Sequence, residues 1–109
     1  MKVLLGIDGT EDSLYALPRA IERAAEGGDS LTIAILDHPG TDRDPDDLYR
    51  RASEELEESG IEAPIRRVSG DPGGQLVDIA EEEGFDAIAL GGVTEFVILN
   101  ATVSVILVR

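Results

Sequence analysis

The chain has 109 residues, the usual size of one domain, and its 42% of apolar residues are enough for a single hydrophobic core. Acidic residues outnumber basic ones by 23 to nine, and the formal charge of −14 excludes nucleic acid as a partner because it repels phosphates. Cysteine is absent, so disulfides and thiolate metal sites are excluded. Asp8 ends the first apolar run too early for a signal peptide, and no run approaches the roughly 20 apolar residues of a membrane helix. We therefore expect a cytoplasmic protein without membrane contact.

Four short, nearly continuous apolar runs are typical of strands buried on both faces of a parallel sheet. They cover residues 3–7, 31–36, 87–90 and 103–108. A fifth run, residues 61–68, contains a proline and two arginines. Because proline cannot donate a ladder hydrogen bond, we expect this run at a sheet edge.

Segments with helical signals lie between these runs. The first ends at the pair Gly27-Gly28, and Pro18 inside it predicts a kink or a late start. The second and third begin with a cap followed by proline, at Asp44-Pro45 and Asp71-Pro72. The fourth covers residues 93–100.

Strands and helices therefore alternate along the chain, which predicts right-handed crossovers and a doubly wound α/β sheet with helices on both faces. No linker, repeat or composition shift divides the sequence, so we expect a single domain over residues 1–109. In open sheets of this kind, ligands bind outside the carboxyl ends of the strands. The residues that follow each strand are therefore the candidates for a site.

Two glycine-containing turns follow strands. Asp8-Gly9-Thr10 comes after the first strand, where the aspartate can bond a ribose or adenine, or can cap the next helix; both interpretations stay open. Gly91-Gly92 comes after the fourth strand and opens into a helix, whose first amides favour an anion. A tight turn also needs glycines there, and that interpretation is favoured.

Residues for catalysis or metal binding are scarce. His38 is the only histidine, and without a Ser or Cys nucleophile motif we interpret it as a loop residue rather than a general base. The acidic clusters Glu54-Glu55, Glu57-Glu58 and Glu81-Glu82-Glu83 indicate helix faces in water, since no mixed His and carboxylate set accompanies them. We expect no enzyme, no metal and no catalytic residue.

The order and spacing of these segments resemble a known family. The matching stretches are Val3–Thr10 with Ser13, Leu31–Leu36, Gly70-Asp71-Pro72 with Leu76 and Ala80, Glu83–Ile88, Val93–Glu95, Asn100-Ala101 and Val105–Arg109. Together they are similar to the universal stress protein (UspA-like) family over essentially the whole chain. The resemblance implies a Rossmann-like, five-stranded parallel sheet with strand order 3-2-1-4-5, a homodimer and a role in stress survival. Some members of the family bind ATP and others do not.

One departure from the family concerns the phosphates. ATP-binding members carry G-x2-G-x9-G-[S/T] after the fourth strand, but here Leu90-Gly91-Gly92 continues directly into Val93-Thr94-Glu95. Each lost charge-assisted contact is worth about 1.5–3 kcal/mol, so we expect weak or no ATP binding. The positions that resemble the family's base and ribose contacts remain. With their neighbours they form a vestigial nucleotide site of Asp8, Gly9, Thr10, Leu36, Gly91 and Gly92.

Two segments indicate protein contacts. Phe96 and Leu99 stand where the family commonly has Lys and Arg, so the fourth helix is apolar nearly all round. This helix either covers ground left bare by the missing loop or contacts a partner, and we favour the partner. An apolar last strand at a sheet edge invites pairing with another copy, as in the family's dimers. The expected homodimer interface consists of Val103, Val105, Ile106, Leu107 and Val108.

The leading hypothesis is a stress-response or regulatory module that acts through protein contacts, with no cofactor beyond a weakly bound adenine nucleotide. The alternative is a sensor of AMP, ATP or a cyclic nucleotide that uses Asp8 and Gly91-Gly92. A nucleotide hydrolase is least favoured, and a phospho-receiver domain is excluded because its lysine after the fifth strand is missing: the only lysine is Lys2. Abundant acids with a single lysine also resemble the proteins of halophilic archaea.

Overall fold

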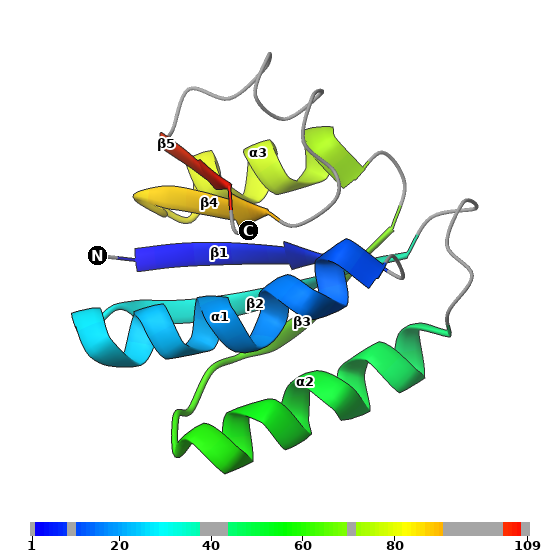
Figure 1. The fold of residues 1–109 in the computed structure, drawn as a ribbon. Helices are drawn as coiled ribbons and strands as arrows, with labels where there is room; N and C mark the ends of the chain where they lie inside the picture. Colours follow the sequence, from blue (N-terminus) through cyan, green and yellow to red (C-terminus); the bar gives the residue numbers. More distant parts are fainter. Residues whose placement is uncertain (1, 9–10, 38–43, 70–71, 91–103, 108–109) are drawn as a thin grey trace.

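The computed structural model describes residues 2–8, 11–37, 44–69, 72–90 and 104–107, in which strands and helices alternate (Figure 1). The elements in chain order are β1 (Lys2–Ile7), α1 (Glu11–Gly27), β2 (Ser30–Asp37), α2 (Pro45–Ser59), β3 (Ile65–Ser69), α3 (Pro72–Glu82), β4 (Ala87–Leu90) and β5 (Ser104–Leu107). The helix expected over residues 93–100 lies outside the described residues.

The strands form one parallel sheet in the order β3-β2-β1-β4-β5. Its central strand is β1, in which Leu5 has Ile33 of β2 on one side and Ala89 of β4 on the other. The chain steps outward from β1 to β2 and β3, and then returns past β1 to β4. The prediction of a Rossmann-like parallel α/β sheet is therefore confirmed.

Helices cover both faces of this sheet, as Figure 1 shows for α1 and α2 on one face and α3 on the other. The alternation of side chains along a strand explains the two cores. Val3, Leu5 and Ile7 of β1 pack with the apolar sides of α1 and α2. Leu4, with Leu36 of β2, packs instead with α3. Near-continuous apolar strands are needed because both faces of β1 and β2 are buried.

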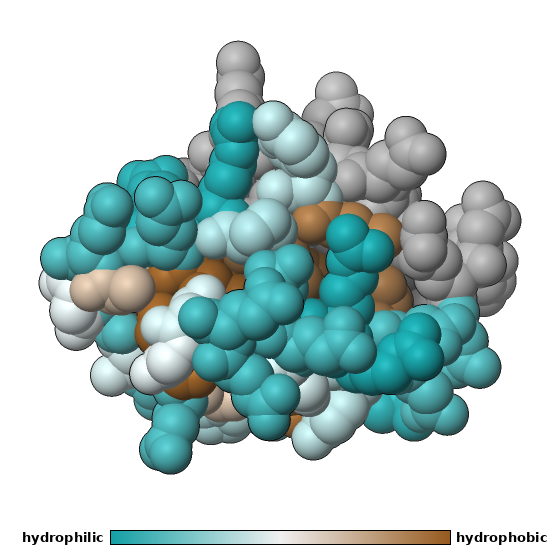
Figure 2. All heavy atoms as spheres, turned by 60° about the horizontal axis from the view of Figure 1, so that its bottom comes forward, coloured by the Kyte–Doolittle hydropathy of each residue, from teal (hydrophilic) through white to brown (hydrophobic). Residues whose placement is uncertain are grey.

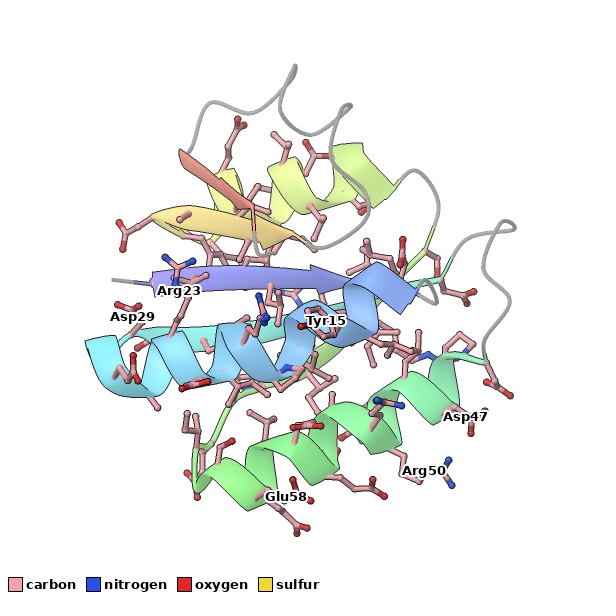
Figure 3. All side chains as sticks on the ribbon, viewed as in Figure 1. Tyr15, Arg23, Asp29, Asp47, Arg50 and Glu58 are labelled. Carbon is pink, nitrogen blue, oxygen red and sulfur yellow. The ribbon has the colours of Figure 1, made fainter. Side chains whose placement is uncertain are left out.

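The outward faces of α1 and α2 are mostly polar, and Figure 2 shows hydrophilic side chains over most of this side, with hydrophobic surface between them. Tyr15 and Arg23 of α1 are exposed, as are Asp47, Arg50 and Glu58 of α2 (Figure 3). The Arg19 guanidinium lies 4.6 Å from the centre of the Tyr15 ring and donates a hydrogen bond of 2.8 Å to its hydroxyl.

Of the kink or late start predicted at Pro18, the late start is wrong, because α1 is one helix from Glu11 to Gly27 with Pro18 inside it, and the kink stays a prediction. A proline inside a helix removes a backbone hydrogen bond at a cost of about 3 kcal/mol. Here Leu14 and Leu17 before the proline and Ile21 after it are all buried in the core. Their burial holds the helix together on both sides of Pro18.

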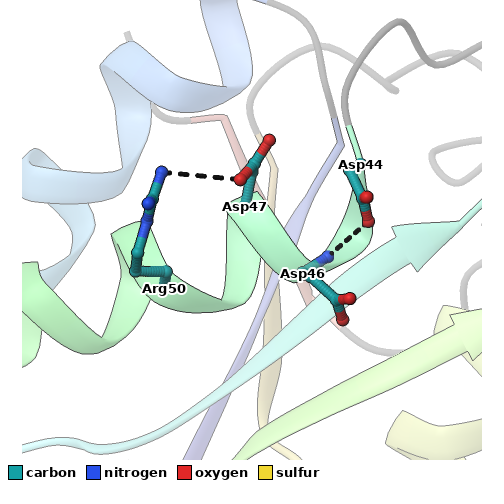
Figure 4. A network of polar contacts seen from close by, with 4 residues as sticks. All are labelled: Asp44, Asp46, Asp47 and Arg50. Carbon is teal, nitrogen blue, oxygen red and sulfur yellow. Dashed lines mark hydrogen bonds and ion pairs between the residues drawn. The ribbon is translucent and has the colours of Figure 1, made fainter.

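The boundaries of α2 follow the local signals. The Asp44 carboxylate accepts a hydrogen bond of 2.9 Å from the Asp46 amide, as expected of an N-cap, and Pro45 occupies the first turn (Figure 4). At the other end, Gly60 has φ 68°, a left-handed conformation that glycine adopts without strain. The predicted start of this helix at Asp44-Pro45 and its predicted end at Gly60 are confirmed.

The edge position of the mixed run is confirmed, but its extent is wrong. The strand β3 begins at Ile65, after Pro64, whereas Ile61 and Ala63 belong to the connection from α2 and pack partly against the core. The Pro64 carbonyl still accepts a hydrogen bond of 2.9 Å from the Ile33 amide of β2. Proline thus stands where the ladder needs an acceptor only.

Candidate functional site

Asp8 follows β1 directly and has only 2% of its surface exposed. The register pairs Ile7 with Ile35, so the next residues, Asp8 and Leu36, come side by side at the carboxyl ends of β1 and β2. Leu36 is fully buried. Two residues of the predicted vestigial site are therefore brought together.

This position is the topological switch point of the sheet. From β1 the chain crosses to β2 on one side, while its other neighbour, β4, is reached only after α3 on the opposite face. Ligands of doubly wound sheets bind in the crevice outside the strands at such a point. Asp8 at the end of β1 and Leu90 at the end of β4 flank it. The remaining predicted residues, Gly9, Thr10, Gly91 and Gly92, lie outside the described residues.

The position of Asp8 bears on its two open interpretations. Because α1 begins at Glu11, Asp8 stands three residues before the helix, whereas an N-cap residue directly precedes the first helical residue. A buried carboxylate offsets its loss of hydration through polar interactions, and Asp8 has such an interaction within the folded chain. The three-residue separation from α1 argues against the interpretation of Asp8 as the N-cap of that helix. Its carboxylate can accept a hydrogen bond from the hydroxyls of a ribose or the amino group of adenine.

Another polar pair lies at the same edge of the sheet. Asp37, half-buried at the end of β2, is in register with Ser69, exposed at the end of β3. The local sequence around Ser69 does not mark it as a site residue. Its position at the end of the edge strand β3 is the one signal for such a role. His38, the next residue after Asp37, lies outside the described residues.

Acidic side chains are numerous but dispersed. Within the described segments, no group of three or more His, Cys, Asp or Glu residues is arranged to hold a metal ion. Glu57 and Glu58 on α2 and Glu81 on α3 are exposed, as expected of helix faces in water. None of the helices that the structure describes is long and apolar enough to span a membrane.

The expected contact surfaces are only partly described. Backbone positions 104–107 form β5, the last strand of the sheet beside β4, which includes Val105, Ile106 and Leu107 of the expected dimer interface. Val103 and Val108 lie outside the described residues, and so do Phe96 and Leu99 of the expected partner surface.

The strand order and the buried aspartate at the switch point define a doubly wound α/β protein of the Rossmann-like type. The model of the universal stress protein family matches residues 1–92, and the chain belongs to this family. No curated protein matches the chain.

Solved structures of the family have the same fold. A universal stress protein in complex with cAMP is 25% identical with a TM-score of 0.78, and the match covers 100% of this chain and 97% of that one. A family member from Burkholderia pseudomallei is 25% identical with a TM-score of 0.77, over 98% of this chain and 94% of that one. The universal stress protein from Archaeoglobus fulgidus in complex with dAMP is 24% identical with a TM-score of 0.67, over 100% and 98%.

Proposed function

We propose that this chain is a non-enzymatic regulatory member of the universal stress protein family that acts through protein contacts and binds ATP weakly or not at all. The observation that carries the proposal is the length of one connection. Since β4 ends at Leu90 and β5 begins at Ser104, any phosphate loop and the helix expected over residues 93–100 would have to share the connection of residues 91–103. The motif G-x2-G-x9-G-[S/T] of ATP-binding members is by itself longer than this connection, whose only glycines are Gly91 and Gly92.

The energetic consequence of a short loop is large. Backbone amides and a hydroxyl hold the phosphates in ATP-binding members, and each charge-assisted contact is worth about 1.5–3 kcal/mol. Losing two of them raises the dissociation constant by roughly two to four orders of magnitude. The formal charge of −14 adds repulsion against a triphosphate. The match to the family model also ends at Gly92, where the loop begins.

The same proposal includes contacts with other proteins. A homodimer through residues 103–108 is supported by the edge position of β5, since among the described strands only β4 pairs with it and its other edge can pair with another copy. Light scattering tests this contact by comparing the mass of the unaltered chain with that of Ile106→Pro, which removes a backbone donor. A monomer mass for the unaltered chain would contradict the homodimer.

A partner contact through Phe96 and Leu99 is tested by Phe96→Glu in the same measurement.

A second candidate function is the sensing of an adenine nucleoside monophosphate or a cyclic nucleotide. The buried Asp8 beside Leu36 at the switch point favours it, because this part of the site requires no phosphate loop. A universal stress protein that is 25% identical to this chain was solved with cAMP. In this candidate, Asp8 contacts the base or ribose, and Gly91-Gly92 contacts a single phosphate.

A thermal-shift panel with ATP, ADP, AMP and cAMP in high salt separates the two candidates. A ligand at a hundred times its dissociation constant adds about 2.7 kcal/mol to the free energy of unfolding. No shift with any nucleotide supports the first candidate. A shift with AMP or cAMP that disappears in Asp8→Ala, but persists in Asp37→Ala at the same edge, supports the second. A larger shift with ATP than with AMP contradicts both.

A further inference from the structure

The outer edge of β3 has backbone groups with which no described strand pairs. Of the strands that the structure describes, only β2 pairs with β3. The Pro64 carbonyl points toward β2, since it accepts from the Ile33 amide. Successive residues of a strand direct their N–H and C=O groups to opposite sides, so Ile65, Arg67 and Ser69 present theirs to the outside. Such an edge is a template for another strand.

A groove lies beside the amino end of this edge, between α2, from Tyr49 to the end of the helix, and the segment that leads into β3. Its apolar lining consists of Tyr49, Leu56, Ile61, Ala63, Pro64 and Ile65. Tyr49 is 47% exposed and is one of the large hydrophobic residues that the described surface leaves to solvent. Hydrophobic surface is visible between the polar side chains on this side of the molecule (Figure 2).

Charge indicates what fits this groove. The only charged side chains among its described lining residues are Glu57 and Glu62, and both are acidic. The basic residues nearby in β3 are already engaged, since Arg67 pairs with Asp46 at 3.1 Å and Arg66 pairs with Glu83. An apolar floor with an acidic rim is complementary to a segment that carries apolar and basic side chains in alternation.

We propose that the outer edge of β3 and this groove form a docking site for an extended basic segment of a partner protein, which adds to the sheet as a further strand. Main-chain hydrogen bonds to Ile65, Arg67 and Ser69 supply affinity, and alternate side chains of the segment contact the groove. The inference rests on the proposed regulatory function and deepens it by naming a class of partner, and it uses none of the predicted nucleotide-site residues Asp8, Gly9, Thr10, Leu36, Gly91 and Gly92. A second copy of this chain fits poorly, because its formal charge of −14 repels the same acidic rim.

The test uses the full chain and a synthetic peptide in which lysine and valine alternate over six residues, with two control peptides. One control has glutamate in place of lysine, and the other carries N-methyl groups on alternate amides. NMR titration of the ¹⁵N-labelled chain should show shifts at the amides of Ile65, Arg67 and Ser69 with the lysine peptide. Both controls should bind at least about tenfold more weakly, because one lacks the charge and the other the donors.

Variants of the chain locate the contact. Arg67→Pro removes an outward donor but no hydrogen bond to β2, and should weaken binding about tenfold, whereas Arg67→Ala keeps the donor and should not. The pair Glu57→Lys and Glu62→Lys should weaken binding by about tenfold or more. The pair Glu22→Lys and Glu26→Lys makes the same charge change on the exposed face of α1 and should leave the affinity within about twofold.

The outcomes separate a docking site from general attraction to an acidic protein. The proposal would be overturned if both pairs of Glu→Lys substitutions weakened peptide binding equally. It would also be overturned if the NMR shifts were scattered over the acidic helices, or if the lysine peptide did not bind. If Arg67→Pro does not fold, the two lysine pairs still decide. Binding of nucleotides has no bearing on these results, so the docking site and the proposal of weak ATP binding can fail independently.

Discussion

Glu83 illustrates how one side chain ties two parts of the fold together. It follows α3, and its carboxylate accepts a hydrogen bond from Arg66 of β3. Its backbone carbonyl accepts a hydrogen bond of 2.7 Å from the Lys2 ammonium, which also lies 4.4 Å from the centre of the Phe85 ring. The hydrogen bond from Arg66 lowers the pKa of Glu83, the positive charges of Arg66 and Lys2 lower it further, and desolvation opposes them.

This shift predicts a pH dependence of stability. Because the pKa of Glu83 is lower in the folded chain, its stabilising effect is present above the pKa of the unfolded chain and is lost as the pH falls through the folded pKa. Glu83→Gln should therefore reduce the free energy of unfolding slightly at pH 7, and the difference should vanish in acid. Urea unfolding from pH 7 to pH 3 measures it, with Glu22→Gln as the control. A difference that grows as the pH falls contradicts the account.

Single residues also mark the limit of sequence-based prediction for the site. The strand-end position of Asp8 follows from the apolar run before it, which is a local pattern. Its closeness to Leu36 depends on the register between β1 and β2, which no local pattern fixes. For the same reason Ser69, opposite Asp37, has no signal of its own. The groove beside β3 combines residues of α2 with the following connection, so only the folded chain reveals it.

At the scale of elements, the start of α2 provides a quantitative prediction. Asp44→Ala removes the side-chain acceptor for the Asp46 amide, and N-cap substitutions of this kind cost about 1 kcal/mol. Glu58→Ala in the last turn of the same helix is the control. A negative charge at that end opposes the helix dipole, so its removal should not destabilise the chain. Thermal or urea unfolding of both variants provides the comparison, and an equal loss from both would be inconsistent with the capping role.

Elements are predictable where their signals are local and not where packing decides. The proline and glycine boundaries of α2 act within one turn, so the sequence alone identifies them. Pro18 is unfavourable in any isolated helix, yet the burial of Leu14, Leu17 and Ile21 overrides it. The start of β3 depends on whether the sheet needs a hydrogen-bond donor or only an acceptor at Pro64. Its partner decides this, because the Ile33 amide needs only the Pro64 carbonyl as an acceptor.

At the scale of the whole molecule, the most pronounced feature is the formal charge of −14. Like charges repel in the compact state, and the Debye length falls from about 30 Å at 0.01 M salt to about 3 Å at 1 M. The melting temperature should therefore rise between dilute buffer and 1 M KCl. A variant with Glu22→Gln, Glu54→Gln and Glu58→Gln, all at exposed positions, should show a smaller rise. A melting temperature that does not change with salt, or the same rise in both proteins, would contradict a role for self-repulsion.

The alternation of strands and helices was sufficient to predict the parallel sheet, because right-handed crossovers permit few other arrangements. The proposed weak binding of ATP depends on the length of one connection, residues 91–103 between β4 and β5. In the proposal, so short a segment offers fewer backbone amides to a polyphosphate than the motif of ATP-binding members does.

Calorimetric titration of the full chain with ATP and with AMP in high salt tests this point most directly. The account predicts that ATP binds no more tightly than AMP, because the additional phosphates meet no further backbone amides. An ATP dissociation constant in the micromolar range, or one about tenfold below that of AMP, would contradict it.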